Sequence, residues 1–140
     1  GHTELLAAEC ARHGHPCEVR MMLANPELKT VLVTIHQSLR SAIDAVSFDA
    51  VLQTLRISHA AAGGWGQPRP RIAVAGLNPH AGEGGLFGDE ELRIIAPAVA
   101  ASMPSVLAII ALAAACGLRL TTFTSLIDRP FFFSIQARVK

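Results

Sequence analysis

Residues 72–85 read IAVAGLNPHAGEGG, and this stretch decides the fold that we expect. Its first four residues are apolar, as in a short buried strand. Glycines then lie at 76, 82, 84 and 85, where they permit positive φ angles and a close approach to a ligand. Pro79 stiffens the chain before His80 and disfavours helix at Asn78. The stretch therefore predicts a strand that runs into a glycine-rich loop built to present the imidazole of His80.

Further strands and helices alternate with this strand along the chain. Apolar and β-branched residues predict strands over 19–23, 30–34 and 71–75. Helices are expected over 3–12, 39–46 and 89–96, and from a Ser47 cap to a Gly/Pro-rich loop at 60–70. In the Ser47-capped helix, apolar residues recur at helical spacing at Phe48, Val51, Leu52 and Leu55. This alternation indicates an α/β fold.

Composition narrows the class of protein. The 140 residues are 51% hydrophobic and 16% charged, which fits one globular domain rather than a disordered chain. A net charge of +1 without a basic stripe argues against a nucleic-acid partner. Cys10, Cys17 and Cys116 fit no zinc motif and are expected as thiols in a reducing cytosol. No signal peptide precedes Gly1, so we expect a cytoplasmic protein, and the opening on Gly1 indicates a piece of a longer chain.

One apolar run favours a different class. The run from Ile94 to Leu118 has no charged side chain and is long enough to span a bilayer. Pro97 and Pro104 interrupt it, and alanine dominates its composition. A buried or misfolded alanine-rich helix is therefore favoured over a membrane span, and a small membrane-associated protein stays as the alternative.

Two histidines come shortly after predicted strands. His36 ends the apolar run 31–35, and His80 lies in the loop after residues 72–75. Ligand sites of open α/β sheets lie outside the carboxyl ends of strands, so both imidazoles are candidates for one site. Two such rings can share a divalent metal, with Zn–N distances of about 2.0–2.1 Å. For each histidine taken alone, a hydrogen-bonded loop residue is the alternative.

Three further polar residues are candidates for the same site. His2 and Thr3 form a polar pair, although Thr3 taken alone is better explained as a helix cap in a Gly-His-Thr-Glu capping box. Glu83 lies between two glycines of the loop, where its carboxylate could orient a histidine ring or face a substrate. A solvated loop charge is the alternative for Glu83. The loop matches neither nucleotide-binding glycine motif, so its glycines alone imply no nucleotide.

Several segments together resemble one enzyme family. They are GHTE at 1–4, MMLA at 21–24, His36 followed by Leu39-Arg40, the loop at 76–85, and Glu90-Glu91. In this order and spacing they resemble 4-hydroxythreonine-4-phosphate dehydrogenase, the PdxA family. The resemblance covers residues 1–99, as a central segment of a family chain. We expect residues 100–140 to be a divergent apolar tail from a frameshifted or truncated gene.

The resemblance implies a fold, a reaction and site residues. The fold is an isocitrate/isopropylmalate-dehydrogenase-like α/β fold, here an incomplete three-layer sandwich, in a homodimer. The reaction is the NAD-dependent oxidation of 4-phosphohydroxy-L-threonine followed by decarboxylation, in pyridoxal phosphate biosynthesis. His36 and His80 match two of three histidines that hold a divalent metal (zinc, magnesium or cobalt). His2 and Thr3 match the pair that contacts the phosphorylated hydroxy amino acid.

The chain also departs from the family pattern. The Tyr-His-Asp-Gln motif that carries the third metal-binding histidine does not occur in this sequence. The later residues that bind substrate phosphate and most of the NAD pocket are missing as well, so no catalytic or NAD-binding residue is assigned. We therefore expect the isolated chain to be inactive. The alternative function is an inactive fragment with at most residual metal or partner binding.

Overall fold

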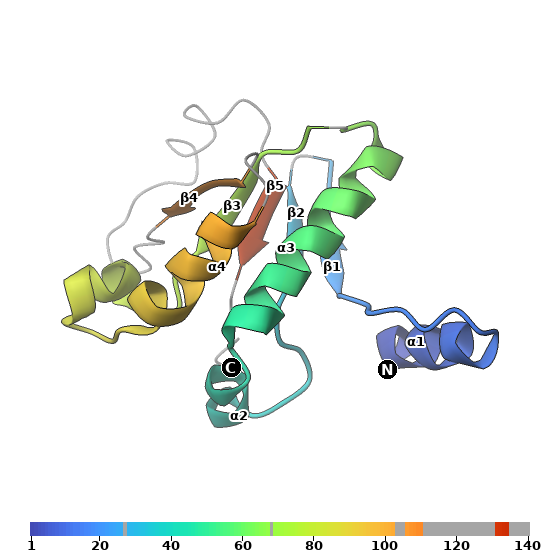
Figure 1. The fold of residues 1–140 in the computed structure, drawn as a ribbon, viewed down its shortest axis with the longest axis horizontal. Coiled ribbons are helices and arrows are strands. Elements are labelled where there is room, and N and C mark those ends of the chain that lie inside the picture. Colours follow the sequence, from blue (N-terminus) through green and yellow to red (C-terminus); the bar gives the residue numbers. More distant parts are fainter. Residues whose placement is uncertain (27, 68, 103–105, 111–130, 135–140) are drawn as a thin grey trace.

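The chain forms a five-stranded mixed sheet. The structure is a computed structural model that describes residues 1–26, 28–67, 69–102, 106–110 and 131–134 (Figure 1). The strands are β1 (Met22–Ala24), β2 (Lys29–Leu32), β3 (Ile72–Ala75), β4 (Val106–Ile110) and β5 (Phe131–Ser134). Their order in the sheet is β1-β2-β5-β3-β4, and only the β1–β2 pair is antiparallel. The predicted α/β class is confirmed.

Helices and short helical turns connect these strands. They are α1 (His2–Arg12), α2 (Leu39–Asp44), α3 (Phe48–Ala62), η1 (Gly63–Trp65), η2 (Pro79–Gly85), η3 (Glu91–Ile95) and α4 (Ala96–Ala101). The connection from β2 to β3 runs through α2 and α3, and that from β3 to β4 runs through η2, η3 and α4. Both are crossovers between parallel strands, for which a helix is the usual connection. Strands β4 and β5 come from the tail, where the sequence pattern predicted none.

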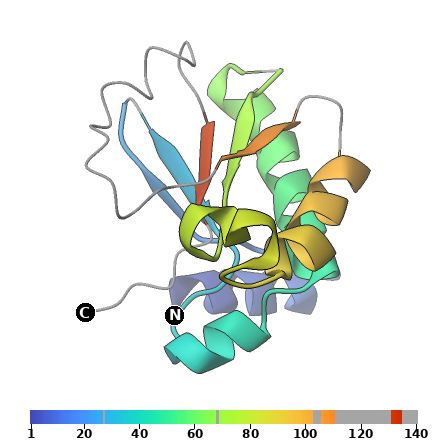
Figure 2. The same ribbon diagram turned by 90° about the vertical axis from the view of Figure 1, so that its left-hand side faces the viewer.

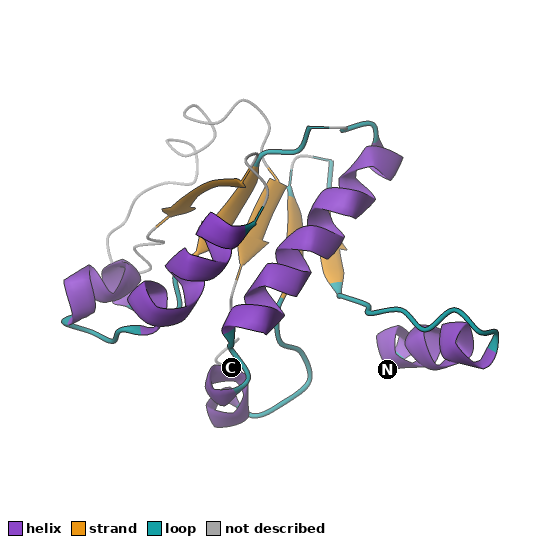
Figure 3. Ribbon diagram, viewed as in Figure 1, coloured by secondary structure: helices purple, strands orange, loops and turns teal. Residues whose placement is uncertain are grey.

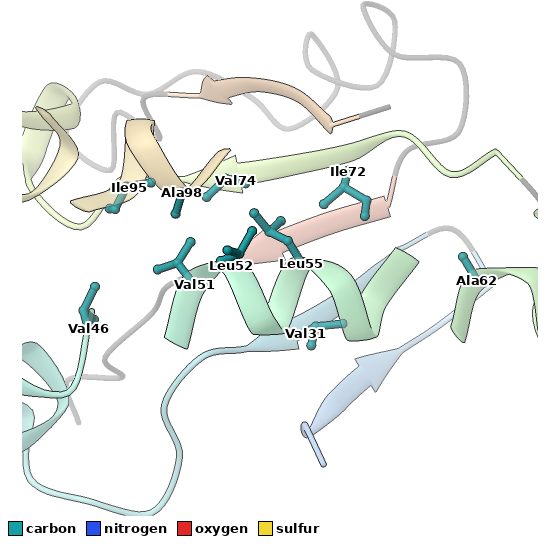
Figure 4. Packing of buried hydrophobic residues seen from close by; sticks show 10 residues of the cluster. All are labelled: Val31, Val46, Val51, Leu52, Leu55, Ala62, Ile72, Val74, Ile95 and Ala98. Carbon is teal, nitrogen blue, oxygen red and sulfur yellow. The ribbon is translucent and has the colours of Figure 1, made fainter. Parts of the chain in front are cut away.

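The core lies between the sheet and helices α3 and α4, which cover one face of it (Figures 3 and 4). Ser47 caps α3 as predicted, since its hydroxyl accepts a hydrogen bond from Ala50 N at 3.2 Å. The buried cluster joins α3 to β2, β3, η3 and α4, and consists of Val31, Val46, Val51, Leu52, Leu55, Ala62, Ile72, Val74, Ile95 and Ala98. Two layers, one of strands and one of helices, are present in the described part of the chain (Figure 2).

The predicted strand over 19–23 begins later than expected, at Met22. Arg20 is drawn to α3 instead of the sheet, because its guanidinium donates to Thr54 Oγ1 at 2.8 Å and to Gln53 Oε1 at 3.0 Å. The same guanidinium donates to Val19 O at 2.7 Å. These bonds attach the segment that follows α1 to the body of the molecule.

Helix α1 stands apart from the sheet (Figure 1) and has no buried residue. Its leucines Leu5 and Leu6 are 64% and 61% exposed. The helix ends at Arg12, and the φ of 79° at Gly14 allows His15 N to donate back to Cys10 O at 2.9 Å. At its start, the expected cap by Thr3 is wrong. Gly1 is the N-cap residue and no side chain caps the helix, so Thr3 lies within the first turn.

The apolar run from Ile94 to Leu118 does not form one helix in the part that the structure describes. It is divided into the end of η3, then α4, and then strand β4. In the described ranges no helix combines the length and the apolar character that a membrane span requires. Residues 111–118 of the run lie outside the described residues.

Candidate functional site

His36 and His80 belong to one edge of the sheet. Strands β2 and β3 each pair in parallel with β5, so their carboxyl ends point the same way with one strand between them. Neighbouring strands lie about 4.8 Å apart, so the ends of β2 and β3 are separated by about 10 Å. Both histidines follow these ends, and both are exposed. The strands are therefore arranged as the sequence predicted, while the metal role of the histidines stays a prediction.

The first turn of α1 lies against His36. A methyl group placed on the Cα of Gly1 would be 3.5 Å from His36 Cε1. The pKa of Glu4 is lowered, chiefly by the hydrogen bond from the Gly1 amine and in smaller part by the nearby His36 ring. His2 and Thr3 lie in this same turn. Three of the predicted site residues, His2, Thr3 and His36, thus share one neighbourhood.

The loop that carries His80 is a left-handed turn. His80, Ala81, Gly82, Glu83 and Gly84 all have positive φ, from 44° at Glu83 to 79° at Gly82. Left-handed backbone costs a residue with a side chain roughly 1–2 kcal/mol. Residues 80, 81 and 83 all carry this cost, and they keep the left-handed conformation only when surrounding contacts enforce it. The turn is closed by Ala81 N donating to Asn78 O and by Phe87 N donating to Gly82 O, both at 3.1 Å.

A buried carboxylate, Glu91, holds the entry to this turn. Its side chain is 3% exposed, and Oε1 accepts hydrogen bonds from Leu77 N and Asn78 N, both at 2.7 Å. Its Oε2 accepts from Asn78 Nδ2 at 2.9 Å, and the same amide nitrogen donates to Glu90 Oε2 at 2.7 Å. Burial raises the pKa of Glu91, but the bonds from Asn78 and Leu77 outweigh it and lower the pKa overall. The carboxylate is therefore ionised at neutral pH.

The glycines of the loop differ in how much space they have. A methyl group on Gly82 would lie 2.6 Å from Gly88 O and 3.0 Å from Glu91 Oε2. One on Gly76 would lie 3.2 Å from Glu91 Oε1. A methyl group on Gly84 would meet nothing within 4 Å. Gly82 is thus required for close packing as well as for its φ, whereas Gly84 serves conformation alone.

Glu91 opens a wide helical turn. Ala96 N donates to Glu91 O, five residues back, so η3 is a π-turn. Pro97 follows at once, and because it has no N–H it cannot donate to the preceding turn. Single π-turns of this kind are frequent at functional sites. This arrangement places Glu91 at the beginning of the helical segment, facing the loop.

Glu91 is the residue whose contacts the sequence reasoning missed. The sequence singles it out only as part of the Glu90-Glu91 motif, and it offers Glu83 as a loop carboxylate that could orient a ring, with a solvated loop charge as the alternative. In the structure Glu83 is exposed, with a φ of 44°. The Glu90-Glu91 pair was a usable signal. Carboxylates at the start of a helix can accept hydrogen bonds from N–H groups that the loop after a strand leaves unpaired.

The imidazoles of His36 and His80 are suitable metal ligands, but they are too few for a complete site. Neutral imidazoles such as His36 and His80 are common zinc ligands, and a structural zinc ion takes four ligands. In the part of the chain that the structure describes, no group of three or more His, Cys, Asp or Glu side chains is placed to hold a metal ion. The described residues therefore do not make a complete metal site.

A family model described as "Pyridoxal phosphate biosynthetic protein PdxA" matches residues 1–115. The chain belongs to the PdxA family. It is 60% identical over 102 residues to a 4-hydroxythreonine-4-phosphate dehydrogenase from Beijerinckia indica and 53% identical over 102 residues to one from Geobacter metallireducens. Each match covers 73% of this chain and 29% of the relative, so the PdxA segment spans under a third of these proteins.

Solved structures that superimpose on this chain include members of the same family. A 4-hydroxythreonine-4-phosphate dehydrogenase from Klebsiella pneumoniae superimposes with a TM-score of 0.78 at 36% identity, over 96% of this chain and 39% of that one. A terephthalate 1,2-cis-dihydrodiol dehydrogenase from Burkholderia xenovorans gives a TM-score of 0.74 at 25% identity, over 96% of this chain and 41% of that one. The relatives are dehydrogenases with different named substrates.

Proposed function

We propose that this chain carries part of the substrate- and metal-binding edge of a 4-hydroxythreonine-4-phosphate dehydrogenase. The observation that supports it is the shared sheet edge, where His36 and His80 follow two parallel strands and His2 and Thr3 lie on the helical turn beside His36. The whole family enzyme oxidises 4-phosphohydroxy-L-threonine with NAD and the product then loses carbon dioxide. This chemistry serves pyridoxal phosphate biosynthesis, for which we expect a cytoplasmic location.

We assign separate roles to the four residues. His36 and His80 are proposed as two of the ligands of a divalent metal, which polarises the substrate hydroxyl when it is bound. His2 and Thr3 are proposed to contact the phosphorylated hydroxy amino acid. Because the described residues bring no group of three ligands together, the proposed metal site of this chain has two protein ligands and is incomplete.

We further propose that the sheet belongs to an isocitrate/isopropylmalate-dehydrogenase-like fold and that the protein pairs as a homodimer. Exposed leucines support the homodimer, since Leu5, Leu6 and Leu23 are each more than half exposed. Large apolar side chains exposed on an unpacked helix and an edge strand are typical of surfaces that become buried on association. Sedimentation velocity over a range of protein concentrations tests this, and a monomer throughout contradicts it.

A second candidate function follows from the incomplete donor set. An inactive segment that retains weak metal binding fits two imidazoles without a third ligand. We therefore expect no NADH production from the purified 140-residue chain with NAD and 4-phosphohydroxy-L-threonine. Measurable turnover overturns the inactive candidate and leaves the enzyme.

Zinc titration by calorimetry tests the shared metal edge itself. We expect His36→Ala and His80→Ala each to abolish zinc binding by the 140-residue chain. His15→Ala is the matched control, because His15 is also exposed but lies in the segment after α1. Equal zinc affinity in the wild-type chain and in His80→Ala contradicts the proposal.

A further inference from the structure

We propose that Glu91 is the positioning residue for His80, holding the left-handed turn in place through the Leu77 and Asn78 amides. The proposal rests on the proposed function for the role of His80 as a metal ligand. The hydrogen bonds between Glu91 and the turn do not depend on that role. It assigns the orienting role to Glu91 rather than to Glu83.

The first step concerns the two backbone donors after β3. Leu77 and Asn78 follow the last residues of the strand and are only partly exposed, so their N–H groups need acceptors. One carboxylate oxygen of Glu91 supplies both bonds at 2.7 Å. Hydrogen bonds to an ionised acceptor are stronger than those to a neutral one, so the chain is fixed firmly here.

The second step concerns Asn78, which links Glu91 to the turn that contains His80. The side chain of Asn78 donates to Glu91, and its backbone carbonyl accepts from Ala81 N at 3.1 Å. Asn78 is thus fixed on both sides, and its carbonyl closes the turn that contains His80. The backbone of His80 has a φ of 52°, which an unsupported chain disfavours.

The third step is that Glu91 also touches the turn after His80. Gly82 packs so closely on Glu91 Oε2 that a methyl group there would lie at 3.0 Å. Glu91 therefore contacts the chain both before and after His80. A side chain in this position fixes the direction in which the imidazole leaves the loop.

The test compares Glu91→Gln with Glu90→Gln in the 140-residue chain. Glu91→Gln keeps the volume but places an amide NH₂ against Asn78 Nδ2 and weakens the acceptor for both backbone amides. Glu90→Gln is the matched control, because Glu90 accepts from the Asn78 side chain whereas Glu91 accepts from the two backbone amides. Hydrogen exchange at Leu77 and Asn78 is measured by NMR, and zinc affinity by calorimetry.

We expect exchange at Leu77 and Asn78 to become about tenfold faster in Glu91→Gln, with little change at Val74 in the core. Zinc affinity is expected to fall by about tenfold, as for other groups that orient a metal ligand. Glu90→Gln is expected to change either quantity by less than about threefold. Ile95→Val controls for general destabilisation, since Ile95 is fully buried in the same element and a lost methyl group weakens the core alone.

A rescue variant tests the hydrogen-bond geometry directly. In a Glu90→Gln background, Asn78→Asp combined with Glu91→Gln exchanges donor and acceptor between the two side chains. Slow exchange and zinc affinity should return part of the way to those of Glu90→Gln alone, since the acceptor for the two backbone amides is still a neutral amide oxygen. The reason is that the introduced glutamine NH₂ would donate to the introduced aspartate carboxylate, while the glutamine oxygen still faces the two backbone amides.

The outcomes distinguish the proposed role of Glu91 from the proposed metal site. If Glu91→Gln leaves both exchange and zinc affinity unchanged, Glu91 does not position His80. Exchange that accelerates equally at Val74 also overturns the inference, because the effect is then global. If the wild-type chain binds no zinc and the two amides still exchange faster in Glu91→Gln, the metal proposal fails and the hold of Glu91 on the turn stands.

Discussion

The His80 loop and helix α1 present candidate site residues in opposite ways. The loop is enclosed by its own chain, with a buried carboxylate bonded to two backbone amides and glycine packed against it. Helix α1, which carries His2 and Thr3, buries none of its residues and exposes both of its leucines. One part of the site is built to a fixed shape within the chain, and the other depends on contacts made at its first turn.

This difference shows what a single segment can and cannot specify. A strained turn is stable here because residues 76–91 contain both the strain and the groups that offset it. For α1, the local sequence specifies the helix and the left-handed glycine, Gly14, that follows its C-cap, but no packing face on this sheet. Arg20 fixes where the segment after α1 joins α3, and the helix itself extends beyond that anchor.

Gly82→Ala should have the largest effect, because it breaks the enclosed loop. Its methyl group would meet Gly88 O at 2.6 Å, and the φ of 79° disfavours any side chain. Together strain and overpacking should lower the free energy of unfolding by about 3 kcal/mol or more. Gly84→Ala, with a φ of 67° but open space, should cost only about 1–2 kcal/mol. Urea unfolding of both variants measures the difference, and equal losses would mean that the loop is not closely packed.

Acid should weaken the same loop through Glu91. The folded-state pKa of Glu91 is lower than that of the unfolded chain, despite burial, because of the bonds from Asn78 and Leu77. Its contribution is therefore complete above the unfolded pKa of about 4.3 and is lost as pH falls through the folded pKa. Between about pH 7 and pH 3, wild type should lose more stability than Glu91→Gln in urea unfolding. Parallel pH profiles in the two proteins would show that Glu91 does not contribute in its ionised form.

Much of the fold could be predicted because its signals are local. The apolar run at 72–75, the Ser47 cap and the helical spacing of Val51 and Leu55 depend only on near neighbours. The start of β1 could not be predicted, since it depends on Arg20 reaching Thr54 in a helix far along the chain. Strands β4 and β5 were missed for a similar reason, because their pairing with β2 and β3 joins distant segments.

The arrangement of the strand ends that carry the candidate site was predictable, and the contacts that support the His80 loop were less so. The rule about strand ends placed His36 and His80 at one edge, because it follows from parallel strand direction alone. The Thr3 cap was a wrong prediction, because Gly1 occupies the N-cap position and Thr3 lies within the helix. Glu91 was not predicted as a support of the loop, because burial decides which carboxylate binds the loop, and burial depends on how η3 packs.

The smallest effect on stability is expected for a change in α1. Leu5→Gln combined with Leu6→Gln keeps a good helix propensity and removes two side chains that are already exposed. The free energy of unfolding should change by less than about 0.5 kcal/mol, as for surface substitutions in general. Leu55→Ala, at a side chain that is 1% exposed, should cost about 3 kcal/mol in the same measurement.

The same double variant also tests whether α1 lacks packing contacts within its own chain. Unfolding is followed at two protein concentrations, because a dimer that contacts α1 makes stability depend on concentration. A loss of stability in the dilute sample would mean that α1 packs on its own sheet, like the loop. A loss confined to the concentrated sample, with weaker self-association by sedimentation, would mean that a second copy of the chain covers the leucines. In that case the position of His2 and Thr3 beside His36 is stabilised by the partner, whereas that of His80 is stabilised by Glu91.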